Sequence, residues 1–298
     1  MTRAGLVSAR LSSGQLADIV DLVDDAQWEL PSACAGWRVI DVLAHLGALA
    51  HEAVEPPAPQ PGLPTDRERY HDLRVDERRG WTHAEVLHEW RVFTPAQLEI
   101  LEAAQEPPRA GDPVEVPGLG TYPRHLLANT MAFNVLCHLR RDLLAPDGPL
   151  PFTLPAETDA LVAPAVEFML AGLPQMQGPE LTATVTEPLV LELTGPGATT
   201  VTVLPAARQD GRREDGPEHD GPQRDGPEQD MGQGGPRREG RRDGLLTVRP
   251  GAEGATRIVS TASDFIAWGT TRKPWRDLCR VIGDPSAATP FLDRLDII

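Results

Sequence analysis

One histidine lies in a segment whose spacing suits a metal-binding helix. His45 follows Asp41 by four residues, in a run that begins with Cys34 and Trp37. Residues four apart share one face of a helix, so the Asp41 carboxylate can accept the N–H of one ring nitrogen and orient the other toward a metal ion. The spacing alone makes a ligand role for His45 plausible without deciding it. The alternative is a half-buried histidine with Asp41 exposed to solvent.

A second histidine is preceded by an amide. His138 follows Asn134 by four residues, which again places both side chains on one helix face. Cys137 lies about 100° around the helix from His138, and we expect it to be buried in the core rather than to bind the same ion. Imidazoles are donors that zinc favours, whereas the neutral oxygen of Asn134 is a weak substitute for a carboxylate.

The remaining histidines do not extend this pattern. We interpret all six as surface or structural residues, with His71 in a polar connection: His51, His71, His83, His88, His125 and His219. Cys34 is expected to pack rather than to act as a nucleophile. The sequence contains no Gly-rich phosphate loop, Gly-x-Ser-x-Gly elbow or Cys-x-x-Cys pair, so the two histidine segments are the candidate site.

Helical periodicity of apolar residues predicts the elements that position these segments. Capping boxes are expected at Ser12 with Gln15 and at Thr82 with Glu85. The predicted helices start at Ser12, span 37–54, run from Thr82 to about residue 104, and run from Pro123 to about residue 144, with a turn-rich connection over 107–122. Residues 1–150 are therefore predicted to form an all-α four-helix bundle.

The pattern changes after residue 150. A helix is expected over 157–173, followed by short runs with strand character at 181–185, 189–193, 200–204, 245–248 and 256–260, and by helices over 263–268 and 286–295. This predicts an α+β domain with an antiparallel sheet over residues 151–298. Residues 206–244 repeat Asp-Gly-Pro with few apolar side chains, which predicts a disordered insert.

Composition limits the classes of partner. The net charge of −16 disfavours nucleic acid and membrane surfaces, which leaves a small molecule as the expected partner. Three cysteines and the lack of a signal-peptide run indicate the cytoplasm. Lys273 is the only lysine among 28 basic residues, which indicates a high-GC coding bias of the source.

The segment from Cys34 to Leu46 resembles the mycothiol-dependent maleylpyruvate isomerase family. It matches that family's pattern Cys-x-Gly-Trp-x-Val-x-Asp-Val-x-x-His-Leu on the second helix. Residues 262–272 and 281–284 are similar to the end of the family's sterol-carrier-protein-like domain, where a helix, an Arg-containing turn and a Gly-Asp pair recur. The resemblance covers nearly the whole chain except the insert, and it implies a DinB-like bundle followed by such a domain.

The resemblance also implies metal ligands. His45 matches the family's ligand histidine, and His138 matches the histidine of a Glu-x-x-x-His motif in which Asn134 stands at the glutamate position. The family tends to place Asp three residues after that histidine, where this chain has Arg141, with Asp142 one residue further. Arg141 adds positive charge that disfavours a cation. Three outcomes stay open: a weakened site of His45, Asn134 and His138, a shifted site that uses a nearby carboxylate, or no metal.

The activity that the resemblance implies is a metal-assisted addition of mycothiol to a small electrophile. A divalent ion, with zinc as the leading candidate, would stabilise the thiolate, and the chain would act as an isomerase or a thiol transferase. Arg272 is the best match to an arginine thought to assist at the family's active site, where it would pair with a substrate carboxylate; the alternative is an arginine that closes a helix C-terminus. Asn134 and Arg141 favour a second reading, a metal-free small-molecule binding or regulatory protein. A third is a lipid carrier that uses the C-terminal domain.

Overall fold

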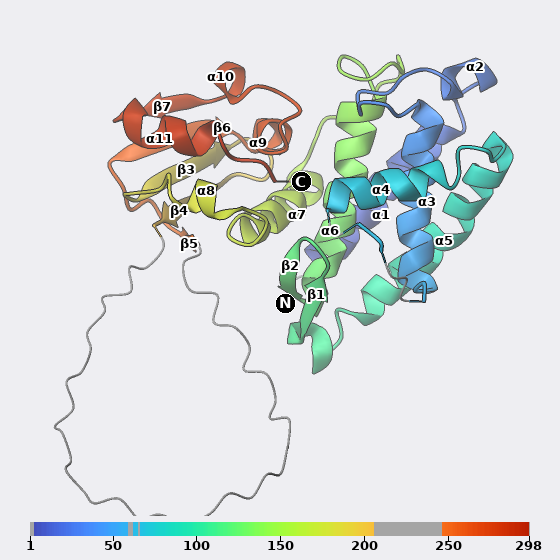
Figure 1. Ribbon diagram of the computed structural model, residues 1–298, viewed down its shortest axis with the longest axis horizontal. Helices are drawn as coiled ribbons and strands as arrows, with labels where there is room; N and C mark the ends of the chain where they lie inside the picture. The colour runs from blue at the N-terminus through green and yellow to red at the C-terminus, as the bar shows by residue number, and fades with distance from the viewer. Residues whose placement is uncertain (1–2, 59–61, 65, 206–245, 298) are drawn as a thin grey trace, which may run out of the picture.

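The computed structural model describes residues 3–58, 62–64, 66–205 and 246–297. Its N-terminal region is built on four main helices, α1 (Ala4–Val20), α3 (Val39–Val54), α5 (His83–Ala103) and α6 (Leu127–Cys137). Helix α3 packs against α5, and α1 packs against α6 (Figure 1). Their apolar faces share a core that includes Leu16, Leu43 and Leu139. The predicted helical bundle is confirmed.

Two shorter helices, α2 (Asp25–Trp28) and α4 (Arg67–Asp76), complete this region. Helix α4 begins after Asp66, whose carboxylate accepts the backbone N–H of Arg69 at 3.0 Å. It packs across α3 (Figure 1). The interpretation of this segment as a polar connection was wrong, because α4 is held by its cap and by tertiary contact rather than by an apolar stripe that periodicity can detect.

The starts of the main helices were predicted with mixed success. Helix α1 begins at Ala4 rather than at Ser12, whose hydroxyl donates to the carbonyl of Ser8 at 2.9 Å inside the helix. A serine hydroxyl can bond to the preceding turn as well as cap a helix, which misled the prediction. Helix α5 does start after Thr82, with the predicted reciprocal bonds between Thr82 and Glu85, and it continues through Pro95.

Helix α6 continues into a π-helical turn, η3 (His138–Leu143). The backbone N–H of Leu144 bonds to the carbonyl of Leu139 at 3.2 Å, which is the five-residue spacing of a π-helix. Turns of this kind occur frequently at functional sites, and this one carries both His138 and Asp142.

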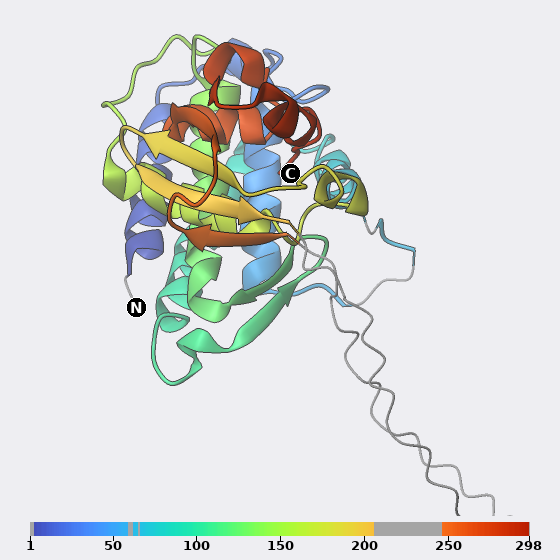
Figure 2. The ribbon, with the colours of Figure 1, turned by 90° about the vertical axis from the view of Figure 1, so that its left-hand side faces the viewer.

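The C-terminal region contains a five-stranded sheet in the order β5-β4-β3-β6-β7. The strands are β3 (Leu189–Thr194), β4 (Thr199–Leu204), β5 (Thr247–Pro250), β6 (Thr256–Thr261) and β7 (Arg280–Ile282). All neighbouring pairs are antiparallel except the central pair β3 and β6, which is parallel. In Figure 2 the strands stand in front of the helical region. The predicted α+β domain with a largely antiparallel sheet is confirmed.

Helix α7 (Asp159–Gly172) joins the two regions. It contacts α1 and α6 on the bundle, and α9 (Ala262–Gly269) beside the sheet. The buried hydroxyl of Ser8 donates to the carbonyl of Leu161 at 2.8 Å, and the Asn129 amide donates to the carbonyl of Pro164 at 3.0 Å. A second core cluster includes Phe133 of α6. The bundle and the sheet domain therefore share continuous packing through α7.

Several connections differ from the predictions. The strand expected at 181–185 is replaced by the short helix α8 (Pro179–Thr182), and the connection over 107–122 contains a hairpin of β1 (Pro113–Val116) and β2 (Gly120–Pro123). Helices α10 (Trp275–Leu278) and α11 (Pro285–Leu292) complete the described chain. The insert predicted at 206–244 lies outside the described residues. Within the described ranges, no helix has the length and apolar character needed to span a membrane.

Candidate functional site

The imidazoles of His45 and His138 come together inside the bundle. His45 lies in the middle of α3, and His138 lies where α6 passes into η3. Their ring centroids are 4.9 Å apart with an interplanar angle of 71°, and the residues are 3% and 6% exposed. The indole of Trp37 packs against both rings, at 5.1 Å from His45 and 6.2 Å from His138. The two histidine segments singled out by the sequence therefore meet at one buried point.

Asn134 reaches the same point from α6. Its amide nitrogen lies 3.4 Å from Nε2 of His45. An amide carries a donor nitrogen and an acceptor oxygen, and rotation of the side chain can turn either atom toward the imidazole. The structure thus brings together the three predicted residues His45, Asn134 and His138.

Asp41 has a different role from the expected one. Its carboxylate accepts the backbone N–H of Arg38 at 2.8 Å and the guanidinium of Arg38 at 2.9 and 3.1 Å, so it caps the start of α3. It is 2% exposed, which also excludes the alternative of a solvated carboxylate. Nδ1 of His45 is buried and has no hydrogen-bond partner among the described residues.

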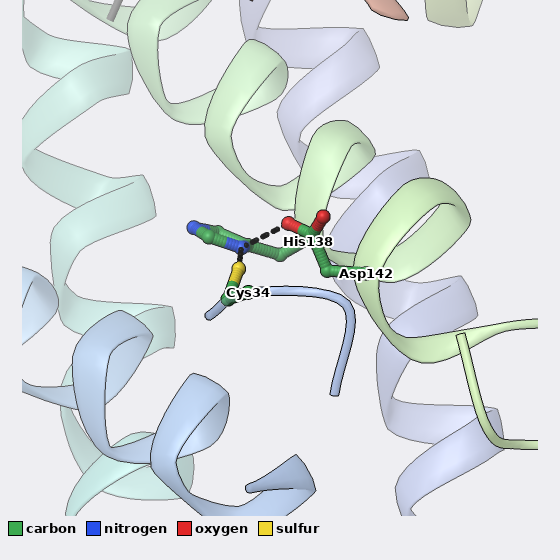
Figure 3. Close-up of side chains that lie close together, drawn as sticks. All are labelled: Cys34, His138 and Asp142. Carbon is green, nitrogen blue, oxygen red and sulfur yellow. Dashed lines mark hydrogen bonds and ion pairs between the residues drawn. The ribbon is translucent and has the colours of Figure 1, made fainter. Parts of the chain in front are cut away.

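The orienting carboxylate belongs to Asp142 and acts on His138 (Figure 3). Nδ1 of His138 donates to Asp142 Oδ2 at 2.7 Å. Arg272 donates through Nε to one oxygen and through Nη2 to the other, both at 2.9 Å. Burial alone would raise the pKa of Asp142, but the hydrogen bonds from His138 and Arg272 outweigh it and hold the pKa well below its usual range. The ionised carboxylate fixes Nδ1 of His138 as the protonated nitrogen and leaves Nε2 for other partners.

Arg272 and Arg141 are both engaged in contacts between the regions. Arg272 follows α9 and reaches Asp142 from the C-terminal domain. Arg141 donates to the hydroxyl of Ser263 and forms an ion pair with Glu157 at 3.4 Å. The carboxylate of Glu157 therefore neutralises the charge of Arg141. The structure gives no support to the expectation that Arg141 makes the site less favourable for a cation.

His71 is a site residue that sequence reasoning missed. Its ring lies 4.5 Å from that of His45, edge to face at 82°. Burial, followed by the charges of Arg67 and His138, lowers the pKa of His71 to about 3. Burial, followed by the charges of His138 and His71, also holds the pKa of His45 well below its usual range. Both rings are therefore neutral at physiological pH. The four-residue spacing of Arg67 and His71 was the available signal for a shared helix face.

Two sets of donors can be compared with what a divalent ion requires. His45 and His138 offer imidazole nitrogens, the kind of donor that zinc favours, with Asn134 as a weak neutral third. Cys34, His138 and Asp142 form the other set, with ligand atoms within 4.8 Å of one another. Within the described part of the chain, the three imidazoles of His45, His71 and His138 do not form such a group.

The second set is the poorer fit. Cys34 Sγ lies 3.7 Å from His138 Nδ1, but that nitrogen already donates to Asp142. Both oxygens of Asp142 are held by Arg272. Burial, followed by the negative charge of Asp142, raises the pKa of the Cys34 thiol, which disfavours the thiolate that a metal needs. The set of His45, Asn134 and His138 fits a divalent ion better.

Three of the other histidines are bonded to partners of their own. Nδ1 of His51 donates to Glu89 at 2.8 Å, Nε2 of His83 to Glu29 at 2.7 Å, and Nδ1 of His125 to the carbonyl of Ala110 at 2.9 Å. Cys137 is 1% exposed, as predicted for a core residue, and burial raises its pKa to about 12. His219 lies outside the described residues.

Comparison with known proteins identifies the bundle. Residues 9–140 match the family model of the mycothiol maleylpyruvate isomerase N-terminal domain. The matched residues cover most of the helical region and less than half of the chain. The crystal structure of the mycothiol-dependent maleylpyruvate isomerase has the same fold, with a TM-score of 0.52 and 16% identity over 95% of both chains. A mutant of that isomerase gives a TM-score of 0.52 and 15% identity, again over 95% of both chains. No curated protein sequence matches the chain.

Proposed function

We propose that this chain belongs to the maleylpyruvate isomerase family and is a mycothiol-dependent enzyme that adds the thiol to a small electrophile. The observation that carries the proposal is the convergence of His45 and His138, from separate helices, with Nδ1 of His138 held by Asp142. A fixed Nδ1–H with a free Nε2 is the state in which histidine binds a metal. Domain boundaries at residues 1–150 and 151–298, and a cytoplasmic location, are parts of the same proposal.

The residues of the chain supply most of the chemistry. A divalent ion bound by His45 and His138, with Asn134 beside it, would supply positive charge that favours the thiolate form of mycothiol. His71 presents a ring 4.5 Å from His45 that stays neutral at physiological pH, so it adds no positive charge to the site. Burial of these rings excludes water, which strengthens charge interactions with a bound anion.

The electron balance distinguishes two reactions. The thiolate forms a carbon–sulfur bond with one carbon of an activated double bond, and the electron pair moves to the activating carbonyl. Rotation about the resulting single bond, followed by loss of the thiolate, gives an isomer with no net change in atoms. If the carbanion instead takes up a proton from solvent, equal to the one that the thiol released, the thiol stays attached and the product is a thioether.

A metal-free small-molecule binding protein is the second candidate, and Asn134 favours it. Replacing the family's glutamate by a neutral amide removes a negative charge that would balance a divalent cation. The role of Arg272 also bears on this choice, since its guanidinium already holds both oxygens of Asp142. We therefore propose that Arg272 positions Asp142 and His138, and that pairing with a substrate carboxylate would require it to leave Asp142.

Metal content measured together with mycothiol binding separates the two candidates. We expect the purified protein to contain about one divalent ion per chain, and mycothiol to bind in calorimetric titration. Dialysis against a chelator should remove both the ion and the thiol binding. A metal-free protein that binds no mycothiol would reject the enzyme and leave the binding protein.

A further inference from the structure

A cavity lies where the first half of α5 packs against the end of α3, on the side of the bundle that faces away from the sheet (Figure 1). Its volume is about 580 Å³, a size typical of small-molecule sites. The residues that line it include His51, Trp81, Glu85, His88, Glu89 and Phe93. His51 follows His45 by six positions, about 9 Å further along α3. The cavity is therefore separate from the imidazoles of the candidate site.

Aromatic rings form part of the cavity wall. Trp81 is 41% exposed, which is unusual for an indole. The ring of Phe93 stacks on the imidazole of His51, with centroids 3.9 Å apart and an interplanar angle of 12°. The guanidinium carbon of Arg78 lies 5.2 Å from the centroid of the Trp81 ring, but Arg78 does not line the cavity. The part of the indole that faces the cavity is therefore open to a ligand.

Two carboxylates also line the cavity, and only one of them has a basic partner. Glu89 is buried and accepts two bonds from the guanidinium of Arg78, at 2.6 and 2.8 Å. Glu85 is exposed, and its Oε2 accepts the backbone N–H and the hydroxyl of Thr82 at 2.7 and 2.8 Å. These bonds lower the pKa of Glu85, which is ionised at neutral pH. Among the described residues that line the cavity there is no arginine or lysine, so the Glu85 charge is available to a ligand.

We propose that this cavity binds a small aromatic cation, with its ring against the side chains of Trp81 and Phe93 and its positive charge near Glu85. The faces of aromatic rings carry partial negative charge and attract cations. The net charge of −16 attracts a cation at long range and repels an anion. The ligand class is therefore an arylalkyl amine in its protonated form. The inference goes beyond the proposed function, since none of His45, Asn134 and His138 lines the cavity.

Three probes of similar size separate the contribution of the ring from that of the charge. Phenethylammonium carries both features. 3-Phenylpropionate has the same ring and chain with the opposite charge, and 2-cyclohexylethylammonium keeps the charge without an aromatic face. Binding to the full-length protein is measured by calorimetry and by ligand-observed NMR. We expect phenethylammonium to bind at least tenfold more tightly than 3-phenylpropionate and at least threefold more tightly than 2-cyclohexylethylammonium.

Two variants test the wall and the charge of the cavity. Trp81→Ala should weaken the binding of phenethylammonium at least tenfold. Its matched control is Trp275→Ala, because Trp275 also lies beside an arginine, with Arg276 at 4.4 Å, but does not line the cavity. Glu85→Gln should weaken binding at least threefold while it keeps the capping box, in which glutamine can replace glutamate. Its control is Glu99→Gln, at an exposed position of the same helix. Both controls should change the affinity less than twofold.

Four results would overturn the proposal. These are no binding of phenethylammonium at millimolar concentrations, binding no tighter than that of 3-phenylpropionate, unchanged affinity in both Trp81→Ala and Glu85→Gln, or loss of binding after treatment with a chelator. The last result would place the ligand at a metal ion instead. Thermal unfolding of each variant checks the fold, and Glu85→Gln keeps the test valid if Trp81→Ala is unstable. A protein that binds phenethylammonium but no mycothiol would keep this inference and reject the proposed enzyme.

Discussion

Arg272 holds both carboxylate oxygens of Asp142 at 2.9 Å, and so connects the C-terminal domain to the imidazole of His138. The residue before it, Thr271, has a φ of 56°, a left-handed conformation that is unfavourable for a β-branched side chain. Local strain of this kind persists where the surrounding structure requires it. Here the turn directs Arg272 back toward the bundle, so the geometry at His138 depends on how the two regions pack.

Removing the guanidinium of Arg272 should therefore affect both stability and the site. We expect Arg272→Gln to lower the free energy of unfolding by about 3 kcal/mol, because it leaves the buried Asp142 charge without the two hydrogen bonds of the guanidinium. Chemical denaturation measures this. Arg276→Gln is the control, since Arg276 is 60% exposed and pairs with Asp293 at the surface; its loss should change stability by less than about 1 kcal/mol. Equal effects of the two variants would contradict the role of Arg272.

The neutral state of His71 predicts a pH dependence. Its pKa is lowered to about 3 in the folded protein, compared with about 6.5 in an unfolded chain. Between these values the unfolded state binds one more proton, so stability falls as the pH drops below about 6.5, by about 1.4 kcal/mol per pH unit for each such histidine.

His71→Gln should flatten this dependence in the metal-free protein. Urea denaturation of the parent and the variant at pH 7 and pH 5 gives the difference in slope. His88→Gln, at an exposed position of α5, should leave the dependence as it is. Parallel curves for His71→Gln and the parent would show that His71 is not buried as a neutral ring.

Asn134 should limit the affinity for a divalent ion. We expect Asn134→Glu to bind zinc at least tenfold more tightly, because a carboxylate replaces a neutral amide beside His45. Competition with a chromophoric chelator measures the affinity. Asn134→Gln has the length of glutamate without its charge, so it should show no gain. An equal gain in both variants would point to side-chain length rather than charge, and no gain in Asn134→Glu would mean that position 134 does not face the ion.

Cys34 should be dispensable for metal binding. Cys34→Ser is expected to keep the metal content of the parent, because the thiol has a raised pKa and Asp142 is occupied by Arg272. Elemental analysis of both proteins tests this, with His45→Ala as the variant that should lose the ion. If Cys34→Ser loses the metal and His45→Ala keeps it, the ion binds to Cys34, His138 and Asp142 instead.

The parts of the site that the sequence could predict are those set by local spacing. His45 and Asn134 with His138 lie on helices whose periodicity is visible, and the capping box of Thr82 and Glu85 is a purely local signal. The remaining parts depend on tertiary contact. Arg272 is 130 positions from Asp142 in the sequence. A contact over that separation cannot be predicted from the periodicity of a single helix or strand.

Asp41 and His71 also show that local spacing does not determine tertiary contacts: Asp41 was expected to orient His45 and does not, whereas His71 was not expected at the site and lies there. The spacing of Asp41 and His45 suited a metal ligand and its orienting carboxylate. In the structure the Asp41 carboxylate instead accepts the backbone N–H of Arg38 at the start of α3, so it is not available to His45. His71 lies in a helix with little apolar character, so its burial arises from packing across α3 and could not be read from α4 alone.

The pairing of β4 with β5 has a consequence for the evolution of this chain. These antiparallel strands are neighbours at one edge of the sheet, and Val203 pairs with Val248 in their register. Leu204 pairs with Thr247, so the described ends of β4 and β5 lie side by side at this edge. Because closing a longer loop is only weakly unfavourable, with about 0.6 kcal/mol for each doubling of its length, this edge can gain or lose sequence while the buried imidazoles keep their geometry.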